Sequence, residues 1–315
     1  MAGIDRYHGI LPLHKPVGMT SHDAVQKVRQ ITRQRGTGHT GTLDPLAEGL
    51  LLLCLGRATK IVRFLTDLEK CYVAEIRLGI RSETFDAEGV SPDAVPEVIP
   101  ALSRDEILAV LSEFEGTISQ HVPAYSAVRV DGERLYKKAR KGESSELPER
   151  EITISRLELL HSHNEALKIE VACSKGTYIR SLANDIGERI GCGAYLASLV
   201  RTRVGHVDLA QSLAIEQVDI MHQQEQLESR LLPIESFLPY GAVWVTDQFS
   251  ESVTQGRSLN PGDVTRIEGT FDVGDRIVLK NNRGLALAVG TAGADSQRFR
   301  SSTTNKLFTY MRVLN

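Results

Sequence analysis

The chain has 315 residues, of which 41% are hydrophobic and 24% are charged. This composition is typical of a globular protein with room for two domains. The formal net charge of −3 argues against a uniformly basic nucleic-acid binder. The longest apolar run, Leu50–Leu55, is far too short to cross a membrane, and the first six residues lack the apolar core of a signal peptide. We therefore expect a cytoplasmic protein with no membrane partner.

Charge is unevenly distributed along the chain. Residues 1–65 carry nine Lys or Arg against four Asp or Glu, and residues 129–141 carry six against two. Residues 82–116 carry one against nine, and residues 206–253 carry one against eight. The basic segments could converge on one face and bind phosphate there. The alternative is that each run is simply a solvated face.

The cysteines suggest buried side chains in a reducing compartment. None of the four forms a Cys-x-x-Cys pair, so neither a zinc ribbon nor a redox motif is supported.

The first third of the chain alternates strands and helices. A strand at Ile10–Leu13 ends in a Pro/Gly turn, and Thr20 or Ser21 caps a helix that runs to about Thr32. A glycine-rich stretch, Gly38–Leu53, then presents a single aspartate before a run of four leucines. A second helix is expected to open at Gly56–Lys60.

A strand follows at Lys70–Ile80, whose alternation places Tyr72 on the apolar face. Residues 81–102 read as an acidic surface connection, and Ser103–Glu106 is a capping box that starts a helix ending at Gly116. The remaining elements are a strand at Tyr125–Val130 with a turn at Asp131-Gly132, a basic helix at Arg134–Lys141, and strands near Glu151–Ser162 and Leu167–Ser174.

The segment Ser174–Arg180 is the second distinctive stretch. A strand ends, Gly176 turns the chain, and Thr177 is expected to cap a helix that continues to about Ile190. Arg180 falls in the first turn of that helix, where the helix dipole disfavours a cation. Its position therefore calls for an anionic partner or a function.

The last quarter of the chain changes character. Frequent turn signals separate short β-branched runs, which predicts a small all-β domain. We expect an α+β protein in which residues 1–240 form a mixed, largely antiparallel sheet with flanking helices, and residues 241–315 form the β domain.

Asp44 is a weak signal when it is taken alone. Asp followed by Pro commonly opens a turn, which is the simplest explanation of Leu43-Asp44-Pro45. A phosphate-binding P-loop is not supported, because no Gly-Lys-Ser/Thr follows. A glycosidase-like pair with Glu48 is conceivable, but spacing in sequence does not place two carboxyls across a sugar.

Four motifs taken together give a specific resemblance. They are Lys15-Pro16-x-Gly18-x-Thr20-Ser21, Gly38-His39-Thr40-Gly41-Thr42-Leu43-Asp44-Pro45-x-Ala47-x-Gly49-Leu50-Leu51, Lys70-x-Tyr72 and Ser174-Lys175-Gly176-Thr177-Tyr178-Ile179-Arg180. In this order, over about residues 10–205, they resemble the bacterial tRNA pseudouridine-55 synthases. The C-terminal part resembles, in length and β content only, the PUA-like RNA-binding domain that ends many of these enzymes.

The resemblance implies an activity and three catalytic residues. The enzyme would isomerise uridine 55 in the T-arm of tRNA to pseudouridine, with no metal and no organic cofactor. Asp44 would act as nucleophile or base, Arg180 would pair with it, and Tyr72 would lie against the uracil with its hydroxyl available for proton transfer. The sequence does not choose among attack at C1′, attack at C6 and a glycal route.

The resemblance also implies substrate-binding residues. Tyr178 and Leu199 would wall the base pocket, and His39 would fill the gap that the extruded uridine leaves. Lys15, Lys60 and Arg57 would contact phosphates.

The segment Arg81–Asp86 and Cys71 depart from the family pattern, and we expect each to alter local RNA contacts only. We expect tRNA as the partner, no protein partner, and a monomer. A catalytically silent RNA-binding or RNA-folding protein, and a guide-RNA-dependent relative, remain as alternatives.

Overall fold

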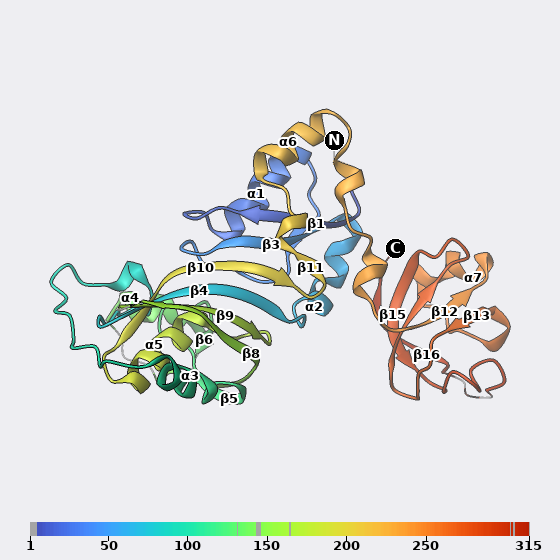
Figure 1. Ribbon diagram of the computed structural model, residues 1–315. Coiled ribbons are helices and arrows are strands. Elements are labelled where there is room, and N and C mark those ends of the chain that lie inside the picture. Colours follow the sequence, from blue (N-terminus) through green and yellow to red (C-terminus); the bar gives the residue numbers. More distant parts are fainter. Residues whose placement is uncertain are drawn as a thin grey trace.

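The protein consists of a long mixed sheet with helices on its faces and a smaller C-terminal sheet (Figure 1). This computed structural model describes residues 5–130, 132–142, 146–163, 165–302, 304 and 306–314. Residues 1–4 of the N-terminal stretch that lacks a signal-peptide core, and Asp131 of the predicted turn at Asp131-Gly132, lie outside the described residues. No helix among the described residues is long and apolar enough to cross a membrane.

The large sheet has the strand order β1-β3-β10-β4-β9-β8-β5, with β2 paired to β3 and β11 paired to β10. Only the β3–β10 pair is parallel among the pairings described within this sheet, so the sheet is mixed and largely antiparallel, as predicted. Its strands are β1 (Gly9–Lys15), β2 (Thr37–His39), β3 (Glu48–Leu55), β4 (Lys70–Leu78), β5 (Gly116–His121), β8 (Glu149–His163), β9 (Ala166–Cys173), β10 (Ala194–Val204) and β11 (Val207–Asp208).

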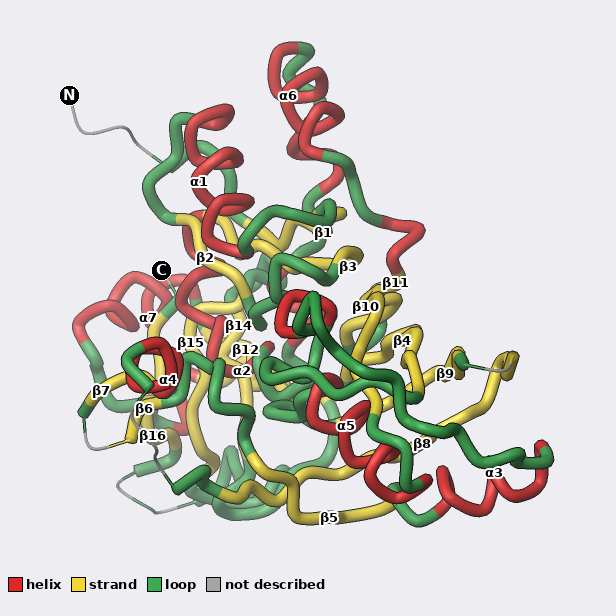
Figure 2. The backbone as a smooth tube through the Cα atoms, turned by 90° about the vertical axis from the view of Figure 1, so that its left-hand side faces the viewer, coloured by secondary structure: helices red, strands yellow, loops and turns green. Residues whose placement is uncertain are grey.

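Helices cover the sheet according to their apolar faces. α1 and α6 lie side by side near β1, and α3 and α5 pack near β8, β4 and β10 (Figures 1 and 2). The α-helices are α1 (Ser21–Thr32), α2 (Val62–Leu65), α3 (Arg104–Ser112), α4 (Leu135–Arg140), α5 (Ile179–Ile190), α6 (Ile215–Gln223) and α7 (Asp247–Ser252). The 3-10 segments are η1 (Gly56–Ile61), η2 (Ala87–Gly89), η3 (Leu209–Gln211), η4 (Leu227–Arg230), η5 (Ile234–Phe237), η6 (Val253–Gln255) and η7 (Pro261–Asp263).

Local capping signals are confirmed at two helices. Thr20 caps α1 and exchanges hydrogen bonds with Asp23, and Ser103 caps α3 in the same way with Glu106. Each box satisfies two donors at the helix start that would otherwise lack a partner. These caps depend on residues three positions apart, which is why the sequence alone could locate them.

Three predicted elements differ in the structure. The helix expected from Gly56 is mainly the 3-10 segment η1, because the Thr59 hydroxyl donates to the Gly56 carbonyl and Gly56 itself adopts φ +55°. The strand expected at Tyr125–Val130 is reduced to β6 (Arg129–Val130), which pairs only with β7 (Glu133–Arg134). Thr177 does not cap α5, because its hydroxyl donates back to the Ser174 carbonyl.

The C-terminal sheet has the order β13-β12-β14-β15-β16. Its strands are β12 (Gly241–Val245), β13 (Val264–Glu268), β14 (Arg276–Lys280), β15 (Ala286–Ala292) and β16 (Phe308–Val313). This sheet shares a hydrophobic cluster with the large one, in which Phe64 and Phe237 pack with Val278 and Val289. The two parts of the chain are therefore in direct apolar contact.

Candidate active site

Asp44 stands on a loop between β2 and β3 whose two ends are fixed by burial. The preceding Leu43 is buried, and the Ser21 hydroxyl holds it by accepting from its N–H at 2.8 Å and donating to its carbonyl at 3.0 Å. After the loop, Leu50–Leu53 are fully buried in the middle of the sheet. The Asp44 side chain itself stays 42% exposed. The loop therefore presents the Asp44 carboxylate to solvent between two buried segments.

Arg180 lies against this carboxylate. Its Nε is 3.0 Å from Asp44 Oδ2, and its Nη1 is 3.3 Å from Asp86 Oδ2. Nη1 also donates to the Thr84 carbonyl and Nη2 to the Tyr125 carbonyl. The Arg180 side chain is only 8% exposed, so the anionic partner that its helical position called for is present twice.

Asp86 is the residue that sequence reasoning missed. The segment around it was expected to alter RNA contacts only, whereas the structure makes it the second carboxylate on Arg180. Asp86 is buried, caps η2 through the Glu88 N–H, and accepts from the Thr84 hydroxyl. No local sequence pattern predicts this role, because Asp86 and Arg180 are 94 residues apart in the chain.

A cavity of about 280 Å³ opens beside Asp44. It brings together five residues singled out from the sequence, namely Asp44, Tyr72, Tyr178, Arg180 and Leu199. Thr42, Leu43, Tyr125, Ser126, Ala127, Tyr136, Thr177 and Ile179 complete its lining. Aromatic and aliphatic walls around a few polar groups are typical of a site for a planar ligand.

Tyr72 and Tyr178 enter this cavity from different elements. Tyr72 is the third residue of β4, and burial raises the pKa of its phenol while the nearby Arg201 guanidinium acts to lower it. Tyr178 precedes α5, and the buried Gln120 side chain holds it by accepting from its N–H at 2.9 Å and donating to its carbonyl at 3.1 Å. Gln120 therefore fixes the backbone of Tyr178, although no side chain caps the first turn of α5.

The remaining predicted residues lie outside the lining of this cavity. His39 ends β2 and is half-buried, and burial is the main reason that its pKa is lowered. Lys15 is fully buried, with Nζ donating to the carbonyls of Pro16 and Met19, and burial lowers its pKa to about 8.

Arg57 and Lys60 lie toward the C-terminal sheet. Arg57 donates to the Leu314 and Ala286 carbonyls, so its side chain joins the two parts of the chain. Lys60 is close enough to Arg57 and Arg312 for their charges to lower its pKa, although burial has the larger effect. Lys15 and Arg57 therefore both donate to backbone carbonyls, and their phosphate contacts stay predictions.

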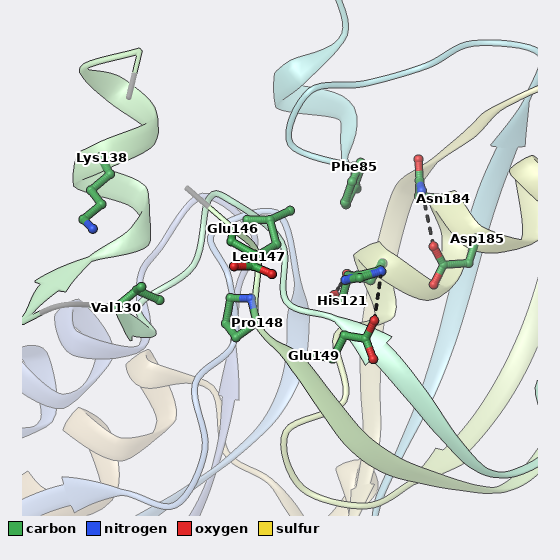
Figure 3. A pocket seen from close by; sticks show the side chains of 11 residues that line it. Phe85, His121, Val130, Lys138, Glu146, Leu147, Pro148, Glu149, Asn184 and Asp185 are labelled. Carbon is green, nitrogen blue, oxygen red and sulfur yellow. Dashed lines mark hydrogen bonds and ion pairs between the residues drawn. The ribbon is translucent and has the colours of Figure 1, made fainter. Parts of the chain in front are cut away.

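A larger cavity, of about 1000 Å³, lies elsewhere on the catalytic part (Figure 3). It borders α5, and Figure 3 shows Phe85 on the same side as the His121–Glu149 and Asn184–Asp185 pairs, with Val130 and Lys138 across from them. Burial raises the pKa of Asp185. Asp44, Tyr72 and Arg180, the three residues predicted to be catalytic, do not line it. Among the described residues, no group of three or more His, Cys, Asp or Glu side chains is placed to hold a metal ion.

Comparison with protein families divides the chain into three matched segments. Residues 29–179 match the N-terminal domain of the TruB family pseudouridylate synthases, residues 180–239 match the C-terminal domain of tRNA pseudouridylate synthase B, and residues 241–313 match the PUA domain.

Similar proteins agree with these matches. The chain is 42% identical to tRNA pseudouridine synthase B of Bacillus licheniformis, over 90% of this chain and 92% of that one. It is 44% identical to tRNA pseudouridine synthase B of Stutzerimonas stutzeri, over 77% and 79%. Among solved structures, a chain of a Cbf5-Nop10-Gar1 complex superposes with a TM-score of 0.74 at 26% identity, over 98% of this chain and 85% of that one. A chain of an H/ACA RNP bound to a substrate RNA containing 2′-deoxyuridine superposes with a TM-score of 0.75 at 25% identity, with the same coverage.

The chain belongs to the TruB family of pseudouridylate synthases. The predicted family and the predicted fold, a mixed-sheet catalytic part followed by a PUA domain, are both confirmed.

Proposed function

We propose that this member of the TruB family isomerises uridine to pseudouridine in tRNA, and that its target is uridine 55 of the T-arm. The names of the B. licheniformis and S. stutzeri relatives support tRNA as the substrate. The observation that carries the proposed chemistry is the accessible Asp44 carboxylate, held 3.0 Å from the buried Arg180 at the mouth of an aromatic-walled cavity.

The reaction requires one glycosidic bond to break and another to form. The bond between uracil N1 and ribose C1′ breaks, the base rotates, C5 bonds to C1′, and the proton on C5 is transferred to solvent while N1 gains one. Oxidation state does not change, so a carboxylate and a proton relay are sufficient. Asp44 acts as the nucleophile or base in each of the three routes, through C1′, through C6 or through a glycal.

Arg180 and Tyr72 support this carboxylate. A guanidinium beside Asp44 favours its ionised form and fixes its direction. Tyr72 lies in the same cavity, where its ring can contact the uracil face and its hydroxyl can exchange a proton. Tyr178 and Leu199 wall the base.

The dimensions of the site imply that the nucleotide leaves its stack. A cavity of about 280 Å³ has room for a single base, and Asp44 cannot reach a uridine that remains inside a folded arm. We place His39 at the gap left behind, because it ends β2 five residues before Asp44 and remains partly exposed.

Residues 1–240 form the catalytic part in this proposal, and residues 241–315 form an RNA-binding part. The C-terminal sheet carries Trp244 with Arg266 and Lys280 stacked near its ring, at 4.8 Å and 5.6 Å from the ring centroid. Cations that are organised around a half-buried aromatic ring are suited to RNA phosphates and bases. Because the proposed substrate is folded tRNA, we expect the protein to act in the cytoplasm.

Tritium release tests the central claim. A T-arm transcript labelled with tritium at uridine C5 should release label with the unaltered protein and not with Asp44→Asn, while both bind the RNA equally. Glu48→Gln is the matched control, because Glu48 is a second carboxylate at the end of the same loop that pairs with His14 rather than Arg180. Full activity of Asp44→Asn would remove Asp44 from the mechanism.

Two alternative functions predict different results. A catalytically silent RNA-folding protein would release no label but would still accelerate tRNA folding, and Asp44→Ala would leave that effect unchanged. A guide-dependent enzyme would need added RNA and protein before it released label. Label release from the naked transcript by this chain alone excludes both alternatives.

A further inference from the structure

Three cations are buried beneath the loop that carries Asp44. Lys15, Lys70 and Arg201 are 0%, 6% and 2% exposed. Burial lowers the pKa of Lys15 and of Lys70 to about 8. An arginine keeps its charge under these conditions, so Arg201 is the permanent cation of the group. A fully buried charge is costly and needs specific partners.

Arg201 donates to two backbone carbonyls of the loop that carries Asp44 and to one carbonyl of the following strand β3. Its Nε lies 2.7 Å from the Leu50 oxygen, its Nη2 lies 3.1 Å from the Gly41 oxygen, and its Nη1 lies 3.4 Å from the Thr42 oxygen. These acceptors flank Asp44 on both sides in the chain. One planar guanidinium therefore connects the loop residues Gly41 and Thr42 to Leu50 in β3. It supplies donors for carbonyls of an irregular segment, where a strand partner is missing.

The backbone of Arg201 is fitted to the same loop. Gly49 pairs with Arg201 in the parallel β3–β10 contact, and a Cβ on Gly49 would lie only 2.4 Å from the Arg201 oxygen. The register of β10 against β4 shifts between Arg201 and Arg203, which marks a β-bulge at this point. Bulges commonly redirect a side chain beside a functional site.

Arg201 is also the cross-strand partner of Tyr72. The two residues are opposite each other in β10 and β4. Burial raises the pKa of the Tyr72 phenol, and the charge and hydrogen bond of the Arg201 guanidinium oppose that rise. The same side chain thus contacts the loop of the carboxylate and acts on the phenol.

We propose that Arg201 is a positioning residue for the reaction, which sets the direction of Asp44 through the 41–50 loop and holds the Tyr72 phenol in its working orientation. This inference rests on the proposed function. Arg201 is not among the residues that line the cavity, so in this proposal it acts through these two groups. Lysine could not replace Arg201 fully, because one ammonium group cannot donate to three carbonyls that surround a planar guanidinium.

The test compares Arg201→Gln and Arg201→Lys in single-turnover tritium release, with the RNA dissociation constant and the melting temperature measured on the same samples. Arg201→Gln should slow the single-turnover rate by about 100-fold, because misplacement of a reacting group by about 1 Å has an effect of that size. The dissociation constant should stay within about threefold, and Arg201→Lys should recover part of the lost rate. Arg203→Gln is the matched control, because Arg203 lies two residues further along β10 and pairs with Glu69 at the surface.

A double-mutant cycle with Tyr72→Phe separates positioning from general loss of stability. If Arg201 acts partly through the phenol, the double variant loses less rate than the product of the two single losses. The proposal would be overturned if the two single losses in rate multiplied in the double variant. It would also be overturned if Arg201→Gln kept a rate within threefold of the unaltered protein at a temperature where both are folded. An inactive unaltered protein would instead refute the proposed function, so the two failures are distinguishable.

Discussion

Asp86 and Arg180 form an ion pair between side chains that are 6% and 8% exposed, with 3.3 Å between Oδ2 and Nη1. Arg180 reaches Asp44 with its Nε at the same time, so one guanidinium joins a buried carboxylate to an accessible one. The buried partner compensates the cost of placing Arg180 inside the protein. The accessible partner, Asp44, is the carboxylate that we propose acts on the substrate.

Removing the buried carboxylate should therefore impair catalysis without impairing RNA binding. We expect Asp86→Asn to slow the single-turnover rate by roughly 10- to 100-fold, because Arg180 loses one of its two anionic supports. The free energy of unfolding should fall by about 2 kcal/mol. Glu88→Gln, an exposed neighbour in η2, should change neither quantity. A fully active Asp86→Asn protein would show that Asp44 alone is enough to orient Arg180.

Gly49 should be the most sensitive glycine of the catalytic loop. It adopts φ +108°, and a Cβ there would overlap the Arg201 oxygen and nitrogen, so Gly49→Ala should destabilise the protein by about 3 kcal/mol or more. Gly18 also has a positive φ, of +80°, but has no atom within 4 Å of such a Cβ. Gly18→Ala should cost about 1 kcal/mol. Urea denaturation measures the free energy of unfolding of the two variants. Gly49→Ala combines steric overlap with backbone strain, whereas Gly18→Ala has backbone strain alone, so equal losses of stability would contradict the packing argument.

Lys70 should make stability depend on pH. Burial lowers its pKa from 10.5 to about 8 in the folded protein, so above about pH 8 the unfolded chain binds more protons than the folded one. The contribution of Lys70 to the free energy of unfolding therefore increases as pH rises above about 8, and it is lost as pH falls through 8. Between pH 7 and 9 the unaltered protein should gain about 1 kcal/mol at most relative to Lys70→Met.

The measurement is the difference in unfolding free energy between these two proteins across that range. The comparison of variants cancels the buried thiols of Cys54 and Cys173, whose pKa values burial raises to about 12. A difference that does not change with pH would mean that Lys70 has the same pKa folded and unfolded.

Arg57 should behave as a residue of the contact between the two sheets. Its guanidinium donates to the Leu314 and Ala286 carbonyls, and Glu235 accepts from the Ala286 N–H at the same place. We expect Arg57→Ala to increase proteolytic cleavage between the two parts of the chain. The salt dependence of tRNA binding should not change.

A direct phosphate contact at Arg57 would give the opposite pattern. Its loss would reduce the slope of log affinity against log salt by about 0.7 to 0.9. Arg35→Ala is the comparison, because Arg35 is exposed on the basic first part of the chain. A reduced slope for Arg57→Ala with unaltered proteolysis would restore the phosphate role first expected from the sequence.

Much of the fold could be predicted because its signals are local. The capping boxes at Thr20 and Ser103 use residues three apart, and the alternation of β4 placed Tyr72 on the buried face. The motif around Asp44 identified the family, and the unusual position of Arg180 indicated an anionic partner. The prediction was wrong for Thr177 because a hydroxyl beside a helix start has several backbone acceptors in reach, and only the tertiary contact with Gln120 decides among them.

What the sequence determined by itself was the family, the mixed sheet with its C-terminal β domain, and the carboxylate on its glycine-rich loop. Only the tertiary structure decided which groups surround that carboxylate. Asp86 and Arg201 lie in segments far from it in the chain, and Lys15 and Arg57, expected at the RNA surface, turn toward backbone carbonyls. The physical reason is that caps and alternation depend on residues a few positions apart. The partners of a buried charge depend instead on which strands are neighbours in the sheet, here β3, β10 and β4.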